Sequence, residues 1–481
     1  MKQWIRRIRR AALWAAALSL TATMAGCHTE PVTSAPETSG TAGSTSASGT
    51  AAGGTIGTAS GTQTSESQPD GSSVTPSTAS TEPQIRDMQE RTFVFCAPSW
   101  DVIDTEEPYI RAIEETYNCH LENLQLADDG TLYSSILATD PLADIIVLND
   151  SNFFSFVQKK LLCNWNAVST AEPSNGELYI VQRNADFTVD GKLYGLMRDN
   201  FALQKVLVYN KSLIRGNDDL QTLASAGQLT WDKLKEILKK AKASGVEGLA
   251  GQMMESDILS TLIHANGGRV FSRDAGLGFT YTLESQNTRN AIRFAQELWA
   301  GGLIMSNTGG NYLYPQSQFA KGRVAMMIAN SWNLNYIFER AKFDVGLVLL
   351  PGGPDADGPL IEQTEFGCYA IPSTAKSPED IGLIFSAWVR AEDQNGNGKN
   401  HFLEYWQDII EDEQNLEVLR TFVREVEAGH STVDFVNAVT SYYDDGLFGA
   451  ENECLQGSMS AQSYLETVGS IYRSKAQDFH W

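Results

Sequence analysis

Short apolar runs alternate with segments of helical period in the first third of the folded region. Residues 92–96, 120–126 and 143–148 have the apolar pattern of strands. Between them, residues 108–117 and 132–139 carry apolar side chains at helical spacing. This alternation of strand and helix predicts a parallel, doubly wound sheet, and the fold class is therefore expected to be α/β.

The loops that follow these strands are the predicted ligand site. In a doubly wound sheet, ligands bind beyond the carboxyl ends of the strands, because the loops there are free to vary in sequence while the rigid sheet holds their ends in place. These loops span residues 97–107, 127–130 and 149–151. They contain side chains that can bond to or stack on a polyol, namely Trp100, Asp101, Asp104, Asp128, Asp129, Asn149 and Asp150.

Later segments carry the start signals of helices. Thr230 is expected to cap a helix whose inner face holds Leu234 and Ile237. Ser377 is expected to cap another helix, with Pro378 in its first turn. The stretch after residue 414 has the pattern of several further helices. Residues 91–481 are too many for one hydrophobic core, which predicts two lobes.

The first residues have the layout of a secretory signal. A basic start is followed by an apolar run from about residue 11 to 24, which is shorter than the roughly 17–25 residues that a membrane span needs. Residues 1–26 are therefore predicted to be a signal peptide. The sequence Met-Ala-Gly-Cys at 24–27 resembles the lipobox of bacterial lipoproteins, and this implies a lipid anchor on Cys27. An ordinary cleaved signal followed by a spare cysteine is the alternative.

Residues 27–88 are predicted to be the lipidated cysteine and a disordered tether. Ser, Thr, Gly, Ala and Pro dominate this stretch, and residues 28–85 contain no aromatic side chain that could form a core. The formal net charge of the chain is −23, which makes nucleic acid and anionic lipid poor partners. Beyond Cys27 there are five cysteines, an odd number, with no CxxC spacing, and their pairing stays open.

A series of motifs occurs in a fixed order along the chain. They are GKLYGL at 191–196, VLVYNK at 206–211, LTWD at 229–232, NGG at 266–268, FAKGRVAM at 319–326 with SW at 331–332, VGL at 345–347 and LPGGP at 350–354. Together they resemble the maltose-binding-like family of extracellular solute-binding proteins, the receptors of ABC importers. The resemblance extends over about residues 91–390.

The resemblance implies a periplasmic-binding-protein-like fold of two α/β lobes joined by a hinge. Lobe I would comprise about residues 91–200 and 360–400, and lobe II about 201–350 and 401–481, within one binding domain from 89 to 481. The lobes of such a protein close around a ligand, so both must supply contacts. Candidate ligand-binding residues are Trp100, Asp101, Asp150, Arg198, Asp199, Trp332 and Phe366.

Among these candidates, Trp332 stands where the family commonly places an aromatic ring that stacks on a sugar. A buried core position is the alternative for Trp332 as it is for Trp100 and Phe366. The resemblance implies a small ligand, expected to be a mono- or oligosaccharide, together with permease subunits as partners and a monomeric state. With the lipid anchor, it implies a location on the extracellular face of the membrane.

Two other functions remain open at this point. A surface glycosidase would need two carboxylates about 5–10 Å apart, and the chain is rich in acids. Against an enzyme, the sequence has no catalytic motif, and His264, His401 and His430 stand isolated along the chain. A sensor or adhesin that binds a sugar without passing it on is the third hypothesis. Neither the binding protein of an importer nor a sensor or adhesin requires a cofactor.

A calcium loop is suggested by one further spacing. Asp393, Asn395, Asn397, the Lys399 carbonyl and Glu404 reproduce the D-x-N-x-N-G-x5-E pattern of a calcium-binding loop. The alternative is an Asn-Gly turn between two helices.

If calcium binds these oxygens, millimolar calcium will raise the melting temperature of the protein, because the ion binds the folded state alone. The shift should disappear in Glu404→Gln, which removes the bidentate ligand. Equal melting temperatures with and without calcium, measured by differential scanning fluorimetry, would contradict the loop assignment.

Overall fold

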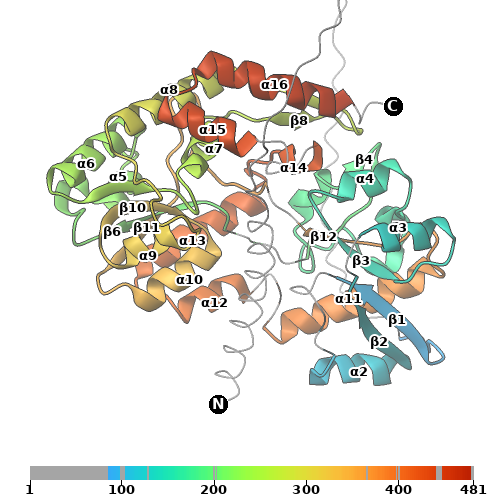
Figure 1. The fold of residues 1–481 in the computed structure, drawn as a ribbon. Helices are drawn as coiled ribbons and strands as arrows, with labels where there is room; N and C mark the ends of the chain where they lie inside the picture. The colour runs from blue at the N-terminus through green and yellow to red at the C-terminus, as the bar shows by residue number, and fades with distance from the viewer. Residues whose placement is uncertain are drawn as a thin grey trace, which may run out of the picture. The chain divides into compact units, whose positions relative to one another are not determined.

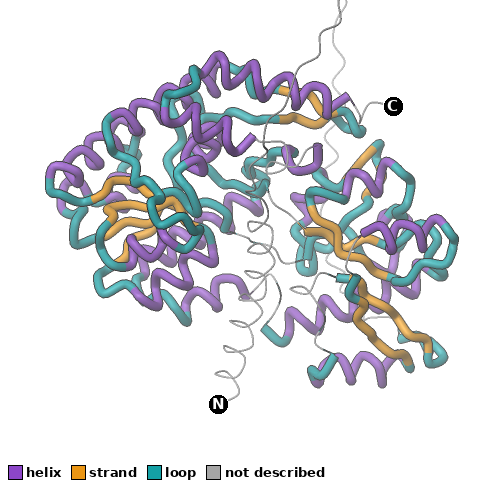
Figure 2. Tube along the Cα trace, viewed as in Figure 1, coloured by secondary structure: helices purple, strands orange, loops and turns teal. Residues whose placement is uncertain are grey.

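The computed structural model describes residues 85–97, 103, 105–126, 129–198, 201, 203–364, 367–396, 398, 401–439 and 447–477. The predictions for the signal peptide, Cys27 and the tether as far as residue 84 lie outside the described residues. The last four residues of the predicted tether, 85–88, are described, and Met88 among them is buried and bonded to Tyr117, so the folded part begins earlier than predicted. The described chain contains two four-stranded sheets and two short two-stranded ones (Figure 1). Figure 2 shows the strands in orange with purple helices packed around them.

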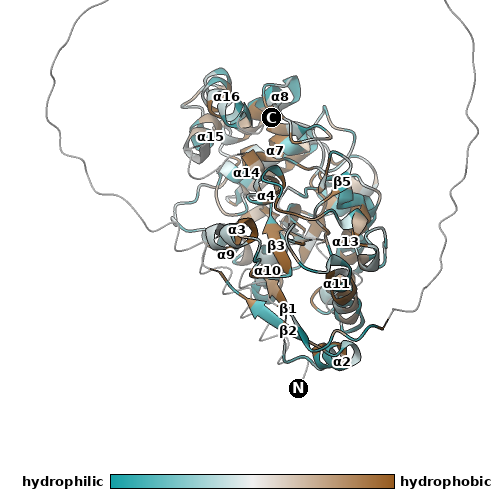
Figure 3. Cartoon of the chain, turned by 90° about the vertical axis from the view of Figure 1, so that its right-hand side faces the viewer, coloured by the Kyte–Doolittle hydropathy of each residue, from teal (hydrophilic) through white to brown (hydrophobic). Residues whose placement is uncertain are grey.

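The first sheet confirms the predicted alternation. Its order is β12-β3-β1-β2, formed by Gly367–Ala370, Ile145–Asn149, Arg91–Cys96 and Cys119–Leu124. Strand β1 pairs in parallel with both β2 and β3, whereas the edge strand β12 runs antiparallel to β3. The sequence IIVLN of β3 is buried at three of its five positions and is brown, the hydrophobic end of the scale, in Figure 3. Apolar runs of this kind are typical of strands that helices cover on both faces.

Four helices accompany the first sheet. They are α2 (Pro108–Tyr117), α3 (Asp129–Leu137), α4 (Phe153–Gln158) and α11 (Pro378–Gln394). Helix α2 buries Ile110, Ile113 and Tyr117, the face that its apolar spacing predicts. Helix α11, distant in sequence, packs on α2, and its Trp388 meets Phe95 of β1 edge to face with ring centroids 5.3 Å apart.

The second sheet has the order β11-β6-β10-β7, formed by Val345–Val348, Val206–Asn210, Val324–Ala329 and Glu247–Ala250. Strand β10 is parallel to β7 and antiparallel to β6, which is also antiparallel to β11. Every residue of β6, β10 and β11 is buried. This sheet is therefore enclosed on both faces.

The remaining helices belong to the second half of the fold. They are α5 (Leu220–Ser225), α6 (Trp231–Ala243), α7 (Ser256–Ala265), α8 (Gln286–Ala300), α9 (Tyr314–Ala320), α10 (Ser331–Arg340), α12 (Phe402–Gln407), α13 (Glu413–Glu427), α14 (Val436–Val439), α15 (Leu447–Gln456) and α16 (Ala461–Gln477). Two hairpins are also present, β4 (Thr188–Val189) with β5 (Lys192–Leu193) and β8 (Phe271–Arg273) with β9 (Phe279–Tyr281). Short 3-10 helices lie at Trp165–Ala167, Ser169–Ala171, Val181–Ala185 and Gly216–Asp218.

One of the two predicted helix caps is present and the other is not. The Thr230 side chain accepts a hydrogen bond from the backbone N–H of Lys233, 3.2 Å away, as expected of a cap. The prediction for Ser377 was wrong. Ser377 has a positive φ of 54° and makes no side-chain cap, because its backbone is left-handed and not in the extended conformation of an N-cap. The carboxylate of Glu379 accepts hydrogen bonds from the backbone N–H groups of Ser169 and Thr170.

The chain passes between the two main sheets through hydrogen-bonded segments. Leu196 pairs with Tyr369 of β12, and a few residues later the Leu203 carbonyl accepts a hydrogen bond from the Ser331 N–H at the start of α10, at 3.0 Å. On the return path, the backbone of Gln363 accepts a hydrogen bond from Arg183 at 3.1 Å and donates one to Thr432 at 2.9 Å. Through these hydrogen bonds, the two connecting segments are attached to residues near both main sheets.

Cysteines and apolar helices add little to the architecture. Cys119, Cys163, Cys368 and Cys454 carry no disulfide. Within the described ranges, no helix combines the length and the apolarity needed to cross a membrane.

Candidate functional site

The carboxyl ends of the parallel strands place several polar residues at corresponding edges of the two sheets. In the first sheet, β3 ends at Asn149 and is followed by Asp150, beside Gly367 of β12. In the second sheet, β7 ends at Ala250 and β10 at Ala329, opposite Val206 at the start of β6. Residues that flank these ends, such as Lys205, Gln252 and Trp332, therefore belong to one edge.

A pocket of about 170 Å³ opens beside this edge of the second sheet. Its walls come from the segment before β6, the loop after β7, one face of α7, the return segment after β11, and helices α14, α15 and α16. The lining residues are Lys205, Gln252, Met253, Asp257, Ser260, Ile263, His264, Val270, Leu283, Glu362, Thr364, Val436, Asn437, Glu451, Tyr464 and Tyr472. A cavity of comparable size in another protein holds a benzene ring, so this pocket has room for one six-membered ring.

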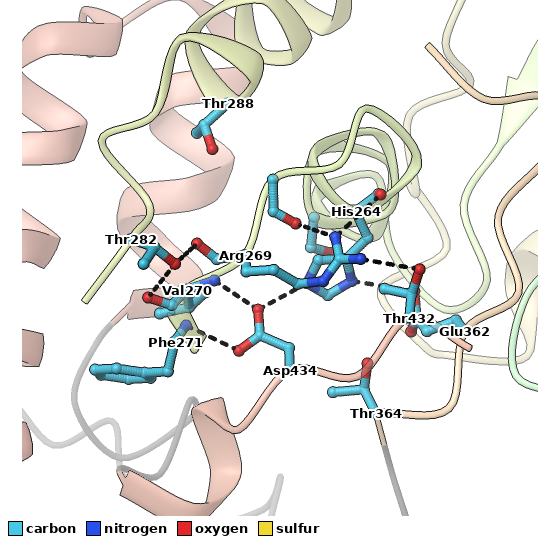
Figure 4. A network of polar contacts seen from close by, with 12 residues as sticks. His264, Arg269, Val270, Phe271, Thr282, Thr288, Glu362, Thr364, Thr432 and Asp434 are labelled. Atoms are coloured by element: carbon cyan, nitrogen blue, oxygen red, sulfur yellow. Dashed lines mark hydrogen bonds and ion pairs between the residues drawn. The ribbon is translucent and has the colours of Figure 1, made fainter. Parts of the chain in front are cut away.

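His264 is held between two carboxylates on one side of this pocket (Figure 4). Its Nδ1 lies 3.1 Å from Glu362 Oε2, and its Nε2 lies 3.1 Å from Asp434 Oδ2. Burial lowers the pKa of His264, but the two carboxylates outweigh that effect and raise the pKa to about 9. The ring is thus an imidazolium at neutral pH. His264 stands alone in the sequence, but the fold gives it two acidic partners.

Asp434 also fixes the backbone at the start of β8. Its carboxylate accepts hydrogen bonds from the N–H groups of Val270, at 2.6 Å, and Phe271, at 3.1 Å. The neighbouring Arg269 donates to the Thr432 hydroxyl at 3.1 Å (Figure 4). These bonds hold the wall of the pocket near Val270 in one position.

Glu451 of α15 is the second unusual group in the pocket. The residue is 2% exposed. Burial, and to a smaller extent the negative charge of Asp257, raise its pKa to about 8. Its Oε2 atom and the hydroxyl of Thr364 have no hydrogen-bond partner among the described residues. Buried polar atoms are nearly always bonded, so these two atoms are suited to bind a ligand.

The charges that line the pocket cancel at neutral pH. Lys205 and His264 are positive. Asp257 and Glu362 are negative, since burial raises the pKa of Glu362 but Lys205 and His264 together lower it below its usual value. Glu451 is protonated at this pH. An ionic ligand would leave one charge unmatched in a buried place, whereas a neutral polar ligand would not.

Trp332 is the predicted site residue with the most favourable surroundings. It lies in the first turn of α10, immediately after the carboxyl end of β10, and is partly exposed. The ring of Tyr312, from a different loop, meets it edge to face with centroids 6.2 Å apart and an angle of 71° between the planes. The two rings form an aromatic corner with accessible surface at the sheet edge.

Two more of the predicted site residues, Asp150 and Arg198, contact other side chains of the protein. The Asp150 carboxylate accepts a hydrogen bond from Asn437 Nδ2 at 2.7 Å, and burial raises the pKa of Asp150 above its ordinary value. Arg198 is buried, with its guanidinium 4.6 Å from the centroid of Trp388 and 3.6 Å from Glu392 Oε2. Asp150 is thus joined to a residue that lines the pocket, whereas Arg198 contacts the core around α11.

Other predicted site residues lie outside the described residues. These are Trp100, Asp101, Asp199 and Phe366 of the ligand set, and Asn397 and Lys399 of the calcium loop. Of the loop's described residues, Glu404 pairs with His401, and a Cβ on Gly398 would lie 2.3 Å from Asp393 Oδ1. Within the described part of the chain, no group of three or more His, Cys, Asp or Glu side chains is arranged to hold a metal. The calcium loop stays a prediction.

Sequence reasoning missed most of the residues that line the pocket. Lys205, Glu362, Asn437 and Glu451 come from four separate segments, and no motif connects them. The one available signal was chemical: Glu451 lies three and four residues before the buried Cys454 and Leu455, on the apolar face of a helix. A carboxyl group on such a face needs a special reason to be there.

Comparison with known proteins gives a family and a fold. A family model described as bacterial extracellular solute-binding protein matches residues 104–395. No curated protein matches the sequence.

Three solved structures are similar to the chain. They are an ABC substrate-binding protein from Listeria monocytogenes in complex with cycloalternan, the GacH receptor of Streptomyces glaucescens, solved unliganded and with acarbose, and the cyclic alpha-maltosyl-1,6-maltose binding protein from Arthrobacter globiformis. Their identities to this chain are 16%, 16% and 15%, with TM-scores of 0.53, 0.53 and 0.56. Each alignment covers 81% of this chain and 98%, 100% and 100% of the respective neighbour. The likeness shows the two-lobed fold.

The His264 network makes stability depend on pH in a defined direction. Because the pKa of His264 is raised from 6.5 to about 9 by folding, its contribution is complete below pH 6.5 and is lost as the pH rises through 9. His264→Gln should therefore lower the free energy of unfolding at pH 6 by about 3 kcal/mol. The difference from the wild type should shrink towards pH 10.

Urea denaturation at pH 6, 8 and 10 measures this effect. His430→Gln is the matched control, because the His430 side chain is 68% exposed and pairs only with Glu425 among the partners described. A loss of stability in His264→Gln that is the same at all three pH values would contradict a charged His264.

Proposed function

This chain belongs to the family of bacterial extracellular solute-binding proteins, and from this we propose that it captures an extracellular carbohydrate for an ABC importer. The observation that carries the carbohydrate is the pocket whose lining charges cancel and whose walls are rich in hydrogen-bonding groups. A sugar is polar but uncharged, so it can satisfy such groups without introducing an unmatched charge. Amino acids and organic anions do not meet this condition as well.

The aromatic corner of Trp332 and Tyr312 supports the same ligand class. A flat indole complements the apolar C–H face of a sugar ring, and the tyrosine meets the indole at a steep angle. An oligosaccharide could place one ring in the pocket and another on the corner, since both features lie at the carboxyl edge of the second sheet. The similar structures support this reading, because cycloalternan, acarbose and cyclic maltosyl-maltose are oligosaccharides or their analogues.

Binding would be coupled to closure of the two lobes. A ligand favours the closed state only if it contacts both lobes there, since it must bind that state more tightly than the open one. Asp150, at the edge of the first sheet, and Asn437, which lines the pocket, are already joined by a hydrogen bond. Trp100, Asp101, Asp199 and Phe366 remain our candidates for further contacts. The closed, loaded protein would then dock on the permease, as a monomer.

We test the ligand class by thermal shift with a named panel. Glucose, maltose, maltotriose and cyclic maltosyl-maltose should include at least one compound that raises the melting temperature, because it binds only the folded protein. Trp332→Ala should weaken binding of that sugar by about 1–3 kcal/mol without changing the far-ultraviolet circular dichroism. Trp299→Ala is the matched control, since Trp299 is partly buried on α8 and does not line the pocket.

Two outcomes would contradict the proposal. The first is a melting shift with amino acids, peptides or metal ions but with none of the sugars. The second is unfolding of Trp332→Ala in the absence of ligand, which would assign Trp332 to the core rather than to the ligand.

We also propose that Cys27 carries the lipid that holds the protein on the extracellular face of the membrane. The support is the signal-like start and the lipobox resemblance. Expressed with its full leader in a bacterial host, the wild type should sediment with membranes and incorporate labelled palmitate. Cys27→Ser should release the protein into the soluble fraction without label, whereas Cys163→Ser should not. Membrane association of Cys27→Ser would contradict the anchor.

A further inference from the structure

Glu451 is a carboxyl group in a place where a carboxylate is unfavourable. It lies on α15, is 2% exposed and lines the pocket. Its Oε2 atom lacks a hydrogen-bond partner among the described residues, as does Thr364 Oγ1 in the return segment after β11. Buried polar atoms are nearly always bonded, so two unbonded ones on residues that line the same pocket indicate a ligand that bonds to both.

The titratable groups around Glu451 come from four parts of the pocket wall. Asp257 and His264 face it from α7, Lys205 from the segment before β6, and Glu362 from the return segment. On α16, Tyr464 and Tyr472 complete the wall. The negative charge of Asp257 opposes a second charge on Glu451, whereas Lys205 and His264 favour it more weakly. Burial, the largest effect, and Asp257 together keep a proton on the carboxyl group at neutral pH, and a protonated carboxyl group can donate a hydrogen bond.

We propose that Glu451 is a ligand-binding residue that donates a hydrogen bond from its carboxyl group to an oxygen of an uncharged sugar ring seated in this pocket. The assignment rests on the proposed function and specifies how the same site selects its ligand. The Thr364 hydroxyl bonds to a second oxygen of the same ring, so the ligand connects α15 with the return segment. Anionic sugars, such as uronates and sugar phosphates, are rejected, because their charge would face the carboxylates of Asp257 and Glu362.

The bound ring also makes affinity depend on pH. By covering the pocket it removes the remaining water from the carboxyl group, which favours the neutral form further. By linkage, a ligand that favours the protonated group binds less tightly once that group ionises. Ionisation of Glu451 is centred at a pKa of about 8 in the unliganded protein. Affinity should therefore be constant below pH 7 and fall about tenfold between pH 7 and pH 9.

The experiment is isothermal titration of maltotriose and cyclic maltosyl-maltose into the full chain at pH 6, 7, 8 and 9. Glu451→Gln replaces the carboxyl group with an amide that donates at every pH. It should bind within about threefold of the wild type at pH 7 and keep that affinity at pH 9. Glu451→Ala removes the donor and should weaken binding at least about tenfold at pH 7.

Glu453→Gln is the matched control, because Glu453 is exposed on the same helix and does not line the pocket. It should lose affinity with pH as the wild type does. His264, with a pKa of about 9, and Lys205 are present in every variant. Any fall in affinity that Glu451→Gln still shows towards pH 9 is assigned to them, and only the additional fall of the wild type is assigned to Glu451. Circular dichroism at each pH checks that the variants are folded.

The outcomes separate this assignment from the proposed function. If a sugar binds and the dissociation constants of wild type and Glu451→Gln change in parallel with pH, Glu451 is not a donor, although the carbohydrate function stands. Binding of glucuronate as tight as that of glucose would also overturn the assignment. If neither the sugars of the panel nor glucuronate binds at any pH, the carbohydrate function and the role of Glu451 fail together.

Discussion

The imidazolium of His264 between two carboxylates is the contact on which the centre of this molecule depends. Glu362 belongs to the return segment after β11, Asp434 precedes α14, and His264 itself belongs to α7. Three parts of the chain, far apart in sequence, are thus joined through one ring. Charges as buried as these are stable only when each has its partner. The same contact fixes the start of β8 and positions one wall of the pocket.

The local signals of the sequence predicted the first sheet well. The three strands and helix α2 between residues 91 and 149 follow the apolar pattern of the sequence, so the local pattern and the tertiary packing agree. The Ser377 cap failed because the backbone of Ser377 is left-handed, which the sequence around it did not indicate. Glu379, the second residue of that helix, bonds to the backbone of Ser169 and Thr170, and a contact across more than two hundred residues leaves no local trace.

The candidate site was harder to predict because its residues are assembled by the fold. Trp332 could be identified because it follows a buried strand within a motif, and the structure puts it at the carboxyl edge of β10. Arg198 looked equally suitable in the sequence but is buried over Trp388. Glu451 had no motif to mark it. Its properties arise from burial and from Asp257, a residue nearly two hundred positions earlier, and neither can be read from neighbouring residues.

The buried cysteines have a practical consequence. Burial raises the pKa of the Cys119 thiol to about 11 and that of Cys454 to about 12, and it raises the pKa of Cys368 well above its ordinary value. Thiolate, the form that reacts with oxidants and alkylating reagents, is scarce in such groups at neutral pH. An engineered surface cysteine would therefore be labelled in preference to these three, and fluorescent probes could be attached on each side of the hinge without first removing them.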